Sequence, residues 1–439
     1  MKSVRFITLG CKVNQYETQG MRESLARAGV TENTSAGDGC DFVVINTCTV
    51  TDAADKENRY WIRRMRRQHP EAKIVITGCY AERNREAIES LPGVDLVIAN
   101  HDKARIADYL ERGCGDPDLQ DEMSERKGRR EYAPLSISRF QGHGRAFVKI
   151  QDGCNHACSF CKVVLVRGRS RSRPLQDIVT EVNRLRDAGY REAVFTGIQL
   201  GAYGADSEQP LDLVDVLRAC SEIEGIERLR LSSIEPTDVR PNLIAALSEL
   251  PKCCPHLHIP LQSGDDAVLA AMNRRYRHEF YADLVEELRS KLPDFSLSLD
   301  VMAGFPSESE EQFENTCALL KSVRPLKCHV FPYSLRDGTK ASKMDSLDPS
   351  VVRSRVNRLI GLADELGEAE RSRYIGQSVD VLVEKELHGG GMVQGLTSNY
   401  LKVCFKGDAD LVGRFLRVEL LSLQGDTFLA RGQRHVMAV

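Results

Sequence analysis

The sequence lacks a membrane span, a secretion signal and a strong net charge. No apolar run reaches the length of a membrane-spanning helix, so we expect no membrane partner. The first residues contain one short apolar strand and no small-residue cleavage site, which argues against a signal peptide and favours a cytoplasmic protein. A formal net charge of −3 provides no global attraction to nucleic acid, so RNA binding would have to use local patches.

Cysteine, in contrast, is abundant. Fourteen cysteines without a secretion signal indicate a reducing compartment and metal or redox roles, and they argue against a disulfide framework. A hydrophobic content of 42% and a charged content of 28% are otherwise those of an ordinary globular protein. A length of 439 residues predicts several domains, each able to bury its own core.

Three of the cysteines, Cys154, Cys158 and Cys161, form a run with the spacing C-x3-C-x2-C. Three thiolates suit a cubane iron–sulfur cluster and leave its fourth iron open to a small molecule. Zinc fits less well, because structural zinc sites usually have four ligands and His156 follows Cys154 too closely for ordinary zinc spacing. The run therefore predicts an open iron–sulfur cluster.

Three further cysteines each follow a short apolar segment rich in β-branched residues. Cys11 follows VRFITLG, Cys48 follows DFVVINT and Cys79 follows KIVITG, a pattern that predicts buried parallel strands. Helical patterns lie between and after them, at Gln15–Ala28, Asp52–Arg67 and Arg83–Ser90. Because the carboxyl ends of parallel strands share one edge, we expect the three thiols to converge into one site. Three unrelated structural cysteines are the alternative.

The C-x3-C-x2-C run resembles the signature of the radical S-adenosylmethionine (SAM) superfamily. In that superfamily the open iron binds the amino and carboxylate groups of SAM, whose reductive cleavage gives a deoxyadenosyl radical. Phe160 matches the aromatic position whose backbone meets the adenine. With TLGCKVNQYET, INTCTVTDAADKEN and ITGCYAER before the run, nearly the whole chain resembles the methylthiotransferase family of radical SAM enzymes.

This resemblance implies SAM and two [4Fe-4S] clusters as cofactors. A radical SAM cluster would be bound by Cys154, Cys158 and Cys161, and an auxiliary cluster by Cys11, Cys48 and Cys79. The family's other SAM-contacting segments add the candidate cofactor-binding residues Phe160, Thr196, Gly197, Ser233, Glu235, Gln262 and Gly304. Without the resemblance, a glycine-containing loop is often only a turn, and a carboxylate before proline, as at Glu235, is often only a helix cap.

The fold class predicted from the patterns is α/β, in three parts. They are an N-terminal parallel-sheet α/β domain at 1–112, a partial (β/α)6 barrel at 143–374 and a small antiparallel β-barrel at 375–439 that resembles the TRAM domain. Residues 113–142 are charged and poor in apolar residues and are predicted to be a linker without a packed core. Six strand–helix units are too few for a full eight-unit barrel of about 250 residues.

Alternating patterns locate the predicted barrel elements. The expected strands are AFVKIQ, which precedes the cysteine run, then Glu192–Gly197, Arg228–Ser233, His256–Gln262, Ser296–Phe305 and Lys327–Ser334. The expected helices are Gln176–Ala188, Leu211–Ser221, Glu279–Leu288 and Ser309–Ser322, with a connecting helix at Pro349–Tyr374. Period-two segments after Gln377 predict the small C-terminal barrel.

Four arginines alternate just after the cysteine run: Arg167, Arg169, Arg171 and Arg173. In an extended segment they would point to one side and bind phosphates or carboxylates, although a solvated charge run is the alternative. The sequence departs from the family here, because KVVLVRG places Val164 and Leu165 where a proline and an aromatic residue are usual. The departure puts the adjoining SAM or substrate wall in doubt.

Two other surfaces are candidates for RNA binding. A predicted helix carries a basic face with Arg59, Arg63, Arg66 and Arg67, which solvent exposure alone would also explain. In the TRAM-like region, which has balanced charge, RNA binding would rely on the placement of Lys402, Lys406, Arg414, Arg417, Tyr400 and Phe405. A module for protein interactions is the alternative for that region.

The resemblance implies a tRNA enzyme that replaces an aromatic C–H bond with C–SCH3. GCKVNQYET is similar to the branch that acts on N6-threonylcarbamoyladenosine (t6A) at position 37, beside the anticodon, whereas the isopentenyladenosine branch has GCQMN and the ribosomal-protein branch GCPKN. The expected partners are the tRNA anticodon stem-loop, an electron donor of the flavodoxin or ferredoxin class, and a sulfur source. The isopentenyladenosine and ribosomal-protein substrates, and a non-catalytic iron–sulfur sensor, stay as alternatives.

Overall fold

The N-terminal part is built on a parallel sheet of five strands in the order β2-β1-β3-β4-β5. The computed structural model describes residues 2–34, 39–83, 85–113, 132, 135–140, 142, 144–208, 210–387 and 389–432. The sheet comprises β1 (Ser3–Thr8), β2 (Thr31–Glu32), β3 (Phe42–Thr47), β4 (Lys73–Gly78) and β5 (Leu96–Val97). Its helices are α1 (Lys12–Arg27), α2 (Asp52–Gln68), α3 (Cys79–Arg83), α4 (Arg85–Glu89) and α5 (Ile106–Arg112).

The central part contains six parallel strands in two three-stranded sheets, β6-β9-β10 and β11-β12-β13, linked by isolated bridges such as Ser233 to His258. The strands are β6 (Ala146–Lys149), β9 (Glu192–Thr196), β10 (Arg228–Leu231), β11 (His256–His258), β12 (Ser296–Ala303) and β13 (Lys327–Pro332). A separate antiparallel pair is formed by β7 (Gln151–Asp152) and β8 (Arg171–Ser172). This arrangement confirms the predicted partial (β/α)6 barrel.

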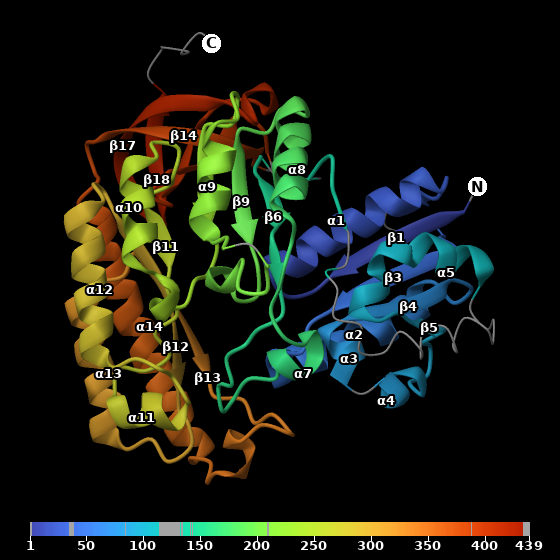
Figure 1. Ribbon diagram of the computed structural model, residues 1–439, viewed down its shortest axis with the longest axis horizontal. Helices are drawn as coiled ribbons and strands as arrows, with labels where there is room; N and C mark the ends of the chain where they lie inside the picture. Colours follow the sequence, from blue (N-terminus) through green and yellow to red (C-terminus); the bar gives the residue numbers. More distant parts are fainter. Residues whose placement is uncertain are drawn as a thin grey trace.

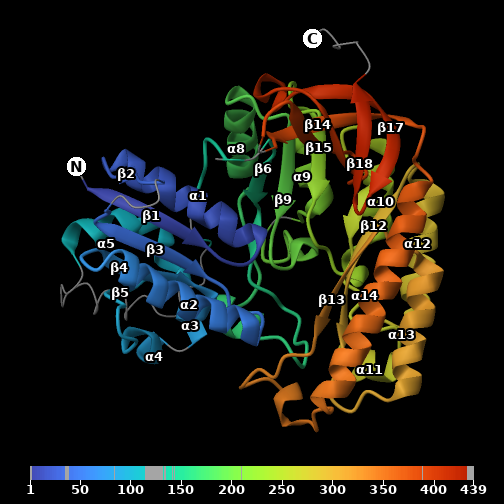
Figure 2. The same ribbon diagram turned by 180° about the vertical axis from the view of Figure 1, so that it is seen from behind.

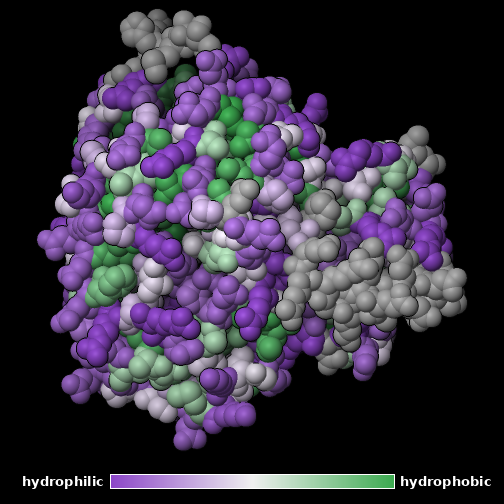
Figure 3. Space-filling model, viewed as in Figure 1, coloured by the Kyte–Doolittle hydropathy of each residue, from purple (hydrophilic) through white to green (hydrophobic). Residues whose placement is uncertain are grey.

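Helices cover the outside of this barrel, as Figures 1 and 2 show from opposite sides. They are α8 (Leu175–Asp187), α9 (Leu213–Ser221), α10 (Pro241–Glu249), α11 (Asp266–Ala271), α12 (His278–Lys291), α13 (Glu310–Val323) and α14 (Pro349–Ser372). The short helix α7 (Val163–Arg167) lies instead beside α3 of the N-terminal domain (Figure 1). Short 3-10 turns are found at Asn100–Arg105, Leu200–Ala202, Pro236–Asp238, Ala341–Lys343 and Ala409–Leu411. The side chains buried between strands and helices form the largest apolar core. On the face drawn in Figure 3, apolar residues occur only in small groups among hydrophilic ones.

The C-terminal part is a closed barrel of five strands in the order β14-β15-β16-β18-β17. Its strands are β14 (Ser378–Glu386), β15 (Met392–Thr397), β16 (Lys402–Lys406), β17 (Phe415–Gln424) and β18 (Thr427–Gly432). All neighbouring pairs are antiparallel except β16 and β18, which are parallel. The predicted small β-barrel is confirmed.

The C-terminal barrel covers the amino ends of the central strands. Arg228 and Arg230, on β10, donate to backbone carbonyls of residues 380 and 396–398. Arg145, just before β6, pairs with Glu384 of β14. The carboxyl ends of the strands, where the cysteine run lies, are therefore at the opposite end from this barrel.

The N-terminal domain spans the gap between the two edge strands of the open barrel. At one edge, Tyr16 of α1 donates to the Leu135 carbonyl and lies within 3.2 Å of Glu181 on α8. At the other edge, Arg336, in the loop after β13, pairs with Asp55 of α2 at 3.2 Å. These contacts fix the N-terminal sheet over the carboxyl ends of the central strands.

One sequence prediction needs correction at this level, and one helix was not predicted. The predicted linker lies mostly outside the described residues, but Leu135, Ile137 and Phe140 are buried in the main core, so this part of it packs against the domains. The third N-terminal helix, expected at Arg83–Ser90, is present as α4 (Arg85–Glu89), and the additional short helix α3, which begins at Cys79, was not predicted. The linker prediction fails because these three apolar residues lie in a stretch that is charged overall. Helix α3 escapes prediction because it starts directly at the end of a strand, where the sequence has no separate helix start signal.

Candidate functional site: two facing cysteine sets

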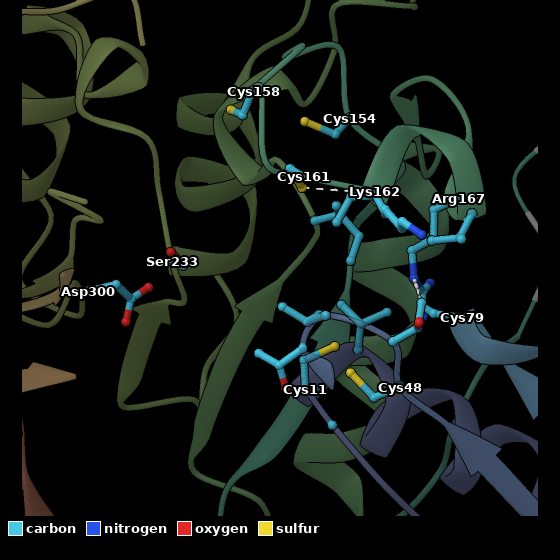
Figure 4. Close-up of a pocket in the computed structure, with 18 of the residues that line it drawn as sticks. Cys11, Cys48, Cys79, Cys154, Cys158, Cys161, Lys162, Arg167, Ser233 and Asp300 are labelled. Carbon is cyan, nitrogen blue, oxygen red and sulfur yellow. Dashed lines mark hydrogen bonds between the residues drawn. The ribbon is translucent and has the colours of Figure 1, made fainter. Parts of the chain in front are cut away.

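Both cysteine sets line one cavity of about 650 Å³. Figure 4 shows Cys11, Cys48 and Cys79 on one side of it and Cys154, Cys158 and Cys161 on the other. The first set belongs to the N-terminal sheet and the second to the loop after β7. The cavity is therefore formed between two domains.

The first set converges because its strands are neighbours. β1, β3 and β4 are adjacent and parallel, which brings the residues that follow them to one edge and confirms the predicted convergence of Cys11, Cys48 and Cys79. Gly10 has φ of +95°, and a Cβ there would lie 2.6 Å from the Cβ of Cys48. Glycine is therefore required at this position for the two cysteines to approach each other.

The second set is held within one loop. The Cys154 and Cys161 sulfurs accept backbone N–H bonds from His156 at 3.3 Å and from Val163 at 3.4 Å. Neighbouring backbone groups anchor the loop, since the Ser159 N–H donates to the Met272 carbonyl at 3.0 Å. The Nε2 atom of His156 lies 4.0 Å from Asp238 and has no hydrogen-bond partner among the described residues.

Burial disfavours the free thiolates in both sets. It raises the pKa of Cys48 and Cys154 to about 12 and that of Cys161 to about 11, and it also raises the pKa of Cys79 and Cys158. Buried thiols of this kind are poor free nucleophiles. A bound metal cation reverses this preference and deprotonates its thiol ligands. The chemistry of both donor sets therefore fits iron–sulfur clusters.

Arg167 connects the two sides of the cavity. Its Nε donates to the Cys79 sulfur at 3.1 Å, and its remaining N–H groups donate to Asn14, Glu17 and Asp152 at 2.7 to 3.2 Å. All five donors of the guanidinium group thus have acceptors. Arg167 follows the second cysteine set by six residues and yet fixes a member of the first.

A buried charge network surrounds this arginine. Lys149 contacts Glu17 at 2.7 Å and Asp152 at 2.8 Å, and Lys103 also pairs with Glu17. Burial alone would raise the pKa of Glu17, but Arg167, Lys103 and Lys149 hold it well below its usual value. These three cations face two carboxylates, so one positive charge remains beside Cys79, where it favours a thiolate.

The predicted arginine strip is wrong. Helix α7 ends at Arg167, and Gly168 turns the chain, so the four side chains do not share one face. Arg173 is buried, where it binds both Glu181 oxygens at 2.9 and 3.1 Å, and is therefore as fully engaged as Arg167. Arg171 donates to the Arg167 carbonyl. Only Arg169 is exposed, and its substrate-binding role stays a prediction.

Most of the residues predicted to contact SAM line the cavity. The lining includes Phe160, Thr196, Gly197, Ser233, Glu235 and Gln262. Glu235 pairs with Arg274, whose guanidinium lies 5.7 Å from the Phe160 ring centre. The Gln262 Oε1 atom is buried and has no hydrogen-bond partner among the residues described. These contacts place the predicted residues around one space, and their roles stay predictions.

Gly304 is the exception, because it does not line the cavity. It has φ of +75°, and a Cβ there would lie 2.6 Å from a methyl carbon of Val352 on α14. Helix packing accounts for the glycine. Val163 and Val166 of the divergent KVVLVRG segment do line the cavity, and Leu165 is exposed.

Sequence reasoning missed several residues of the cavity wall. Lys12, Lys162, Arg274 and Asp300 all line it. Asp300 lies 3.0 Å from His258, and a third ligating side chain, that of His329, completes a group whose ligand atoms lie within 4.8 Å of one another. Lys12 directly follows Cys11, and Lys162 directly follows Cys161. Their position next to a predicted cluster ligand could have identified both lysines as candidate residues of the cavity wall.

The candidate RNA-binding side chains of the C-terminal barrel are only partly available. Phe405 is buried in the core of that barrel, and Tyr400 stacks on His256 with ring centres 4.3 Å apart, so the expectation that both face RNA is wrong. Lys402 pairs with Asp426 at 2.7 Å. Arg414 is exposed, and its side chain has no partner among the described residues.

Comparisons with known proteins cover both halves of the site. Residues 3–99 match the uncharacterized protein family UPF0004, and residues 148–320 match the radical SAM superfamily. The threonylcarbamoyladenosine tRNA methylthiotransferase MtaB of Bacillus subtilis is 39% identical over 425 residues, 96% of this chain and 94% of that protein. The protein of the same name from Thermotoga maritima is 36% identical over 97% of this chain and 96% of its own length.

The chain belongs to the radical SAM tRNA methylthiotransferase family. Its match to the MtaB proteins confirms the predicted threonylcarbamoyladenosine branch, and the family's cofactors, [4Fe-4S] clusters and SAM, agree with the two thiol sets. A relative named for another nucleoside, the tRNA-2-methylthio-N(6)-dimethylallyladenosine synthase of Salinispora arenicola, is 36% identical over 86% of this chain and 76% of its own length.

A solved structure supports the fold alone. The radical SAM methyltransferase TsrM from Kitasatospora setae superposes with a TM-score of 0.56 at 15% identity, covering 75% of this chain and 73% of its own. Within the described part of the chain, no helix is both long and apolar enough to cross a membrane.

Proposed function

We propose that this protein replaces the C2 hydrogen of t6A at position 37 of tRNA with a methylthio group. One observation carries the proposal: two sets of three thiols, each suited to a cluster with an open iron, face the same cavity. With its clusters and SAM bound, the site would supply a SAM-derived radical and a methylated sulfur, chemistry that side chains lack.

The side chains hold and enclose these groups. Cys154, Cys158 and Cys161 would bind the cluster that meets SAM, and the wall with Phe160, Thr196, Gly197, Ser233, Glu235 and Gln262 would contain SAM. Cys11, Cys48 and Cys79 would bind the auxiliary cluster. Arg167 fixes Cys79 from the other domain, so docking sets the separation of the two clusters.

The partners follow from the chemistry and from the relatives. The names of the MtaB relatives specify threonylcarbamoyladenosine in tRNA, which favours an anticodon stem-loop as substrate. Reductive cleavage of SAM consumes an electron, so we propose a donor of the flavodoxin or ferredoxin class. Each modified tRNA leaves with one sulfur atom in its methylthio group, so the enzyme needs a source that replaces this sulfur. We place the reaction in the cytoplasm, where mature tRNA and reduced thiols coexist.

Reconstitution tests the proposal. The purified protein should bind about eight irons per chain as two four-iron clusters. With SAM, reductant and a stem-loop containing t6A, it should form deoxyadenosine, and mass spectrometry should detect the methylthio nucleoside. A fully loaded protein that forms no deoxyadenosine would indicate an iron–sulfur sensor. Modification of isopentenyladenosine or of a ribosomal protein instead would assign it to another substrate class.

A further inference from the structure

Two lysines of the cavity wall, Lys12 and Lys162, have no hydrogen bond or ion pair from their side chains to any described residue. Their surroundings differ. Lys162 experiences the carboxylates of Asp55 and Asp337, along with nearby arginines. The groups that act most strongly on the Lys12 ammonium are Tyr400, Arg145, Arg230 and Cys11, and none of these is a carboxylate.

The charges around Lys12 leave it as the uncompensated cation. Arg145 pairs with Glu384 and lies 3.4 Å from Glu192, and Arg230 donates to Glu192 at 2.7 Å. With Arg228, 3.8 Å from Glu192, three guanidinium groups thus share two carboxylates. Lys12 therefore has no carboxylate partner among the described residues, and its ammonium is available to an anionic ligand group that enters the cavity.

Lys12 is also in the right place to sense a substrate. It follows Cys11 directly and opens helix α1, so its side chain leaves the auxiliary cysteine set and enters the same cavity. Tyr400 of the C-terminal barrel, stacked on His256 at the amino end of β11, does not line the cavity and acts on the Lys12 ammonium from beneath it. The carboxylate of Asp300 in the same wall is engaged by His258 at 3.0 Å.

We propose that the Lys12 ammonium binds the carboxylate of the threonylcarbamoyl group and so selects t6A over nucleosides that lack it. The inference rests on the proposed function and deepens it. A charge-assisted bond in a partly buried cavity is stronger than one at a fully exposed surface. Arg167 and Arg173 cannot take this role, because carboxylates within the protein already occupy them.

The test uses the reconstituted full-length protein and two anticodon stem-loops. One carries t6A, and the other carries the same group with its carboxylate converted to a carboxamide. Fluorescence anisotropy should show that the wild type prefers the carboxylate by roughly 10- to 100-fold, the range for one hydrogen bond to a charged group. Lys12→Gln should bind both RNAs alike, and Lys12→Arg should restore part of the preference.

Lys162→Gln is the matched control and should keep the wild-type preference, since it removes the other unpaired lysine of the wall. Iron content near eight per chain in Lys12→Gln would show that the adjacent Cys11 site is intact. The inference is overturned if Lys12→Gln keeps the preference for the carboxylate RNA. It is also overturned if Lys12→Gln weakens the binding of both RNAs by the same factor, or weakens the binding of SAM by as much as that of the t6A RNA. A wild type that methylthiolates no t6A RNA would instead overturn the proposed function, a result independent of the Lys12 comparison.

Discussion

The two cysteine sets reach one cavity by different routes. Cys154, Cys158 and Cys161 lie within eight consecutive residues, and one loop with its backbone anchors holds them. Cys11, Cys48 and Cys79 are separated by 36 and 30 intervening residues and meet only because three strands are neighbours. The first arrangement depends on local structure, and the second depends on a completed sheet.

The two cysteine sets also differ in where the hydrogen-bond donors to their sulfur atoms come from. The Cys154 and Cys161 sulfurs receive N–H groups from their own loop, whereas Cys79 receives its hydrogen bond from Arg167 of the neighbouring domain. Domain docking is therefore part of the auxiliary site. The difference teaches that the radical site can form within its own domain, while the auxiliary site is coupled to the interface.

The largest expected effect is the loss of one cluster at a time. Cys158→Ser and Cys48→Ser should each reduce iron from about eight to about four per chain. Cys158→Ser should abolish deoxyadenosine formation, whereas Cys48→Ser should keep it and lose only the methylthio product. Iron quantification and product analysis check this. Equal loss of deoxyadenosine in both variants would remove the distinction between the sets.

Arg167→Ala should destabilise the fold by about 3–5 kcal/mol, because it removes one partner from a buried charge network. The auxiliary cluster should then release its iron to a chelator faster than the radical SAM cluster does. Chemical unfolding and timed iron release measure the two effects. Arg167→Lys keeps the charge but not the five donors and is the matched control. Equal release rates from both clusters would contradict the proposed coupling.

A smaller effect is expected from the basic face of α2, the helix whose N-cap, Thr51, lines the cavity that holds Cys48. Arg63 and Arg67 are exposed there. The double change Arg63→Glu with Arg67→Glu should weaken tRNA binding about tenfold and reduce its salt dependence, if each arginine contacts a phosphate. Arg27→Glu, at the far end of α1, is the control. If the tRNA affinity and its dependence on salt concentration do not change, the arginines of this face are exposed to solvent and do not contact RNA.

The smallest effect concerns the cap of α2. The Thr51 side chain accepts the Ala54 N–H at 3.2 Å, directly after the Cys48 strand end. Thr51→Ala should cost about 1 kcal/mol of unfolding free energy, as for other lost caps. Thr51→Ser should cost less, because serine also caps. Thermal unfolding of the three proteins checks the order, and an unchanged alanine variant would show that the sheet edge holds the helix start without its cap.

The sequence by itself determined the elements and the cysteine chemistry. Spacing revealed the radical SAM run, and β-branched segments ending in cysteine revealed the parallel strands, because both signals are local and periodic. The helices at α2, α8 and α13 begin and end within about two residues of their predicted bounds. The six-strand barrel and the small C-terminal barrel follow from the same periodicities.

Only the tertiary structure decided how charged side chains are used. Arg167 and Arg173 alternate with two other arginines, yet Glu17 from the N-terminal domain neutralises Arg167, and Glu181 on the following helix neutralises Arg173. Lys12, next to a cysteine ligand, emerges as a cavity-wall lysine with no carboxylate among its strongest neighbours. Sequence patterns cannot assign such roles, because the charge of a side chain is local whereas its partner and its burial are set by chain segments far away.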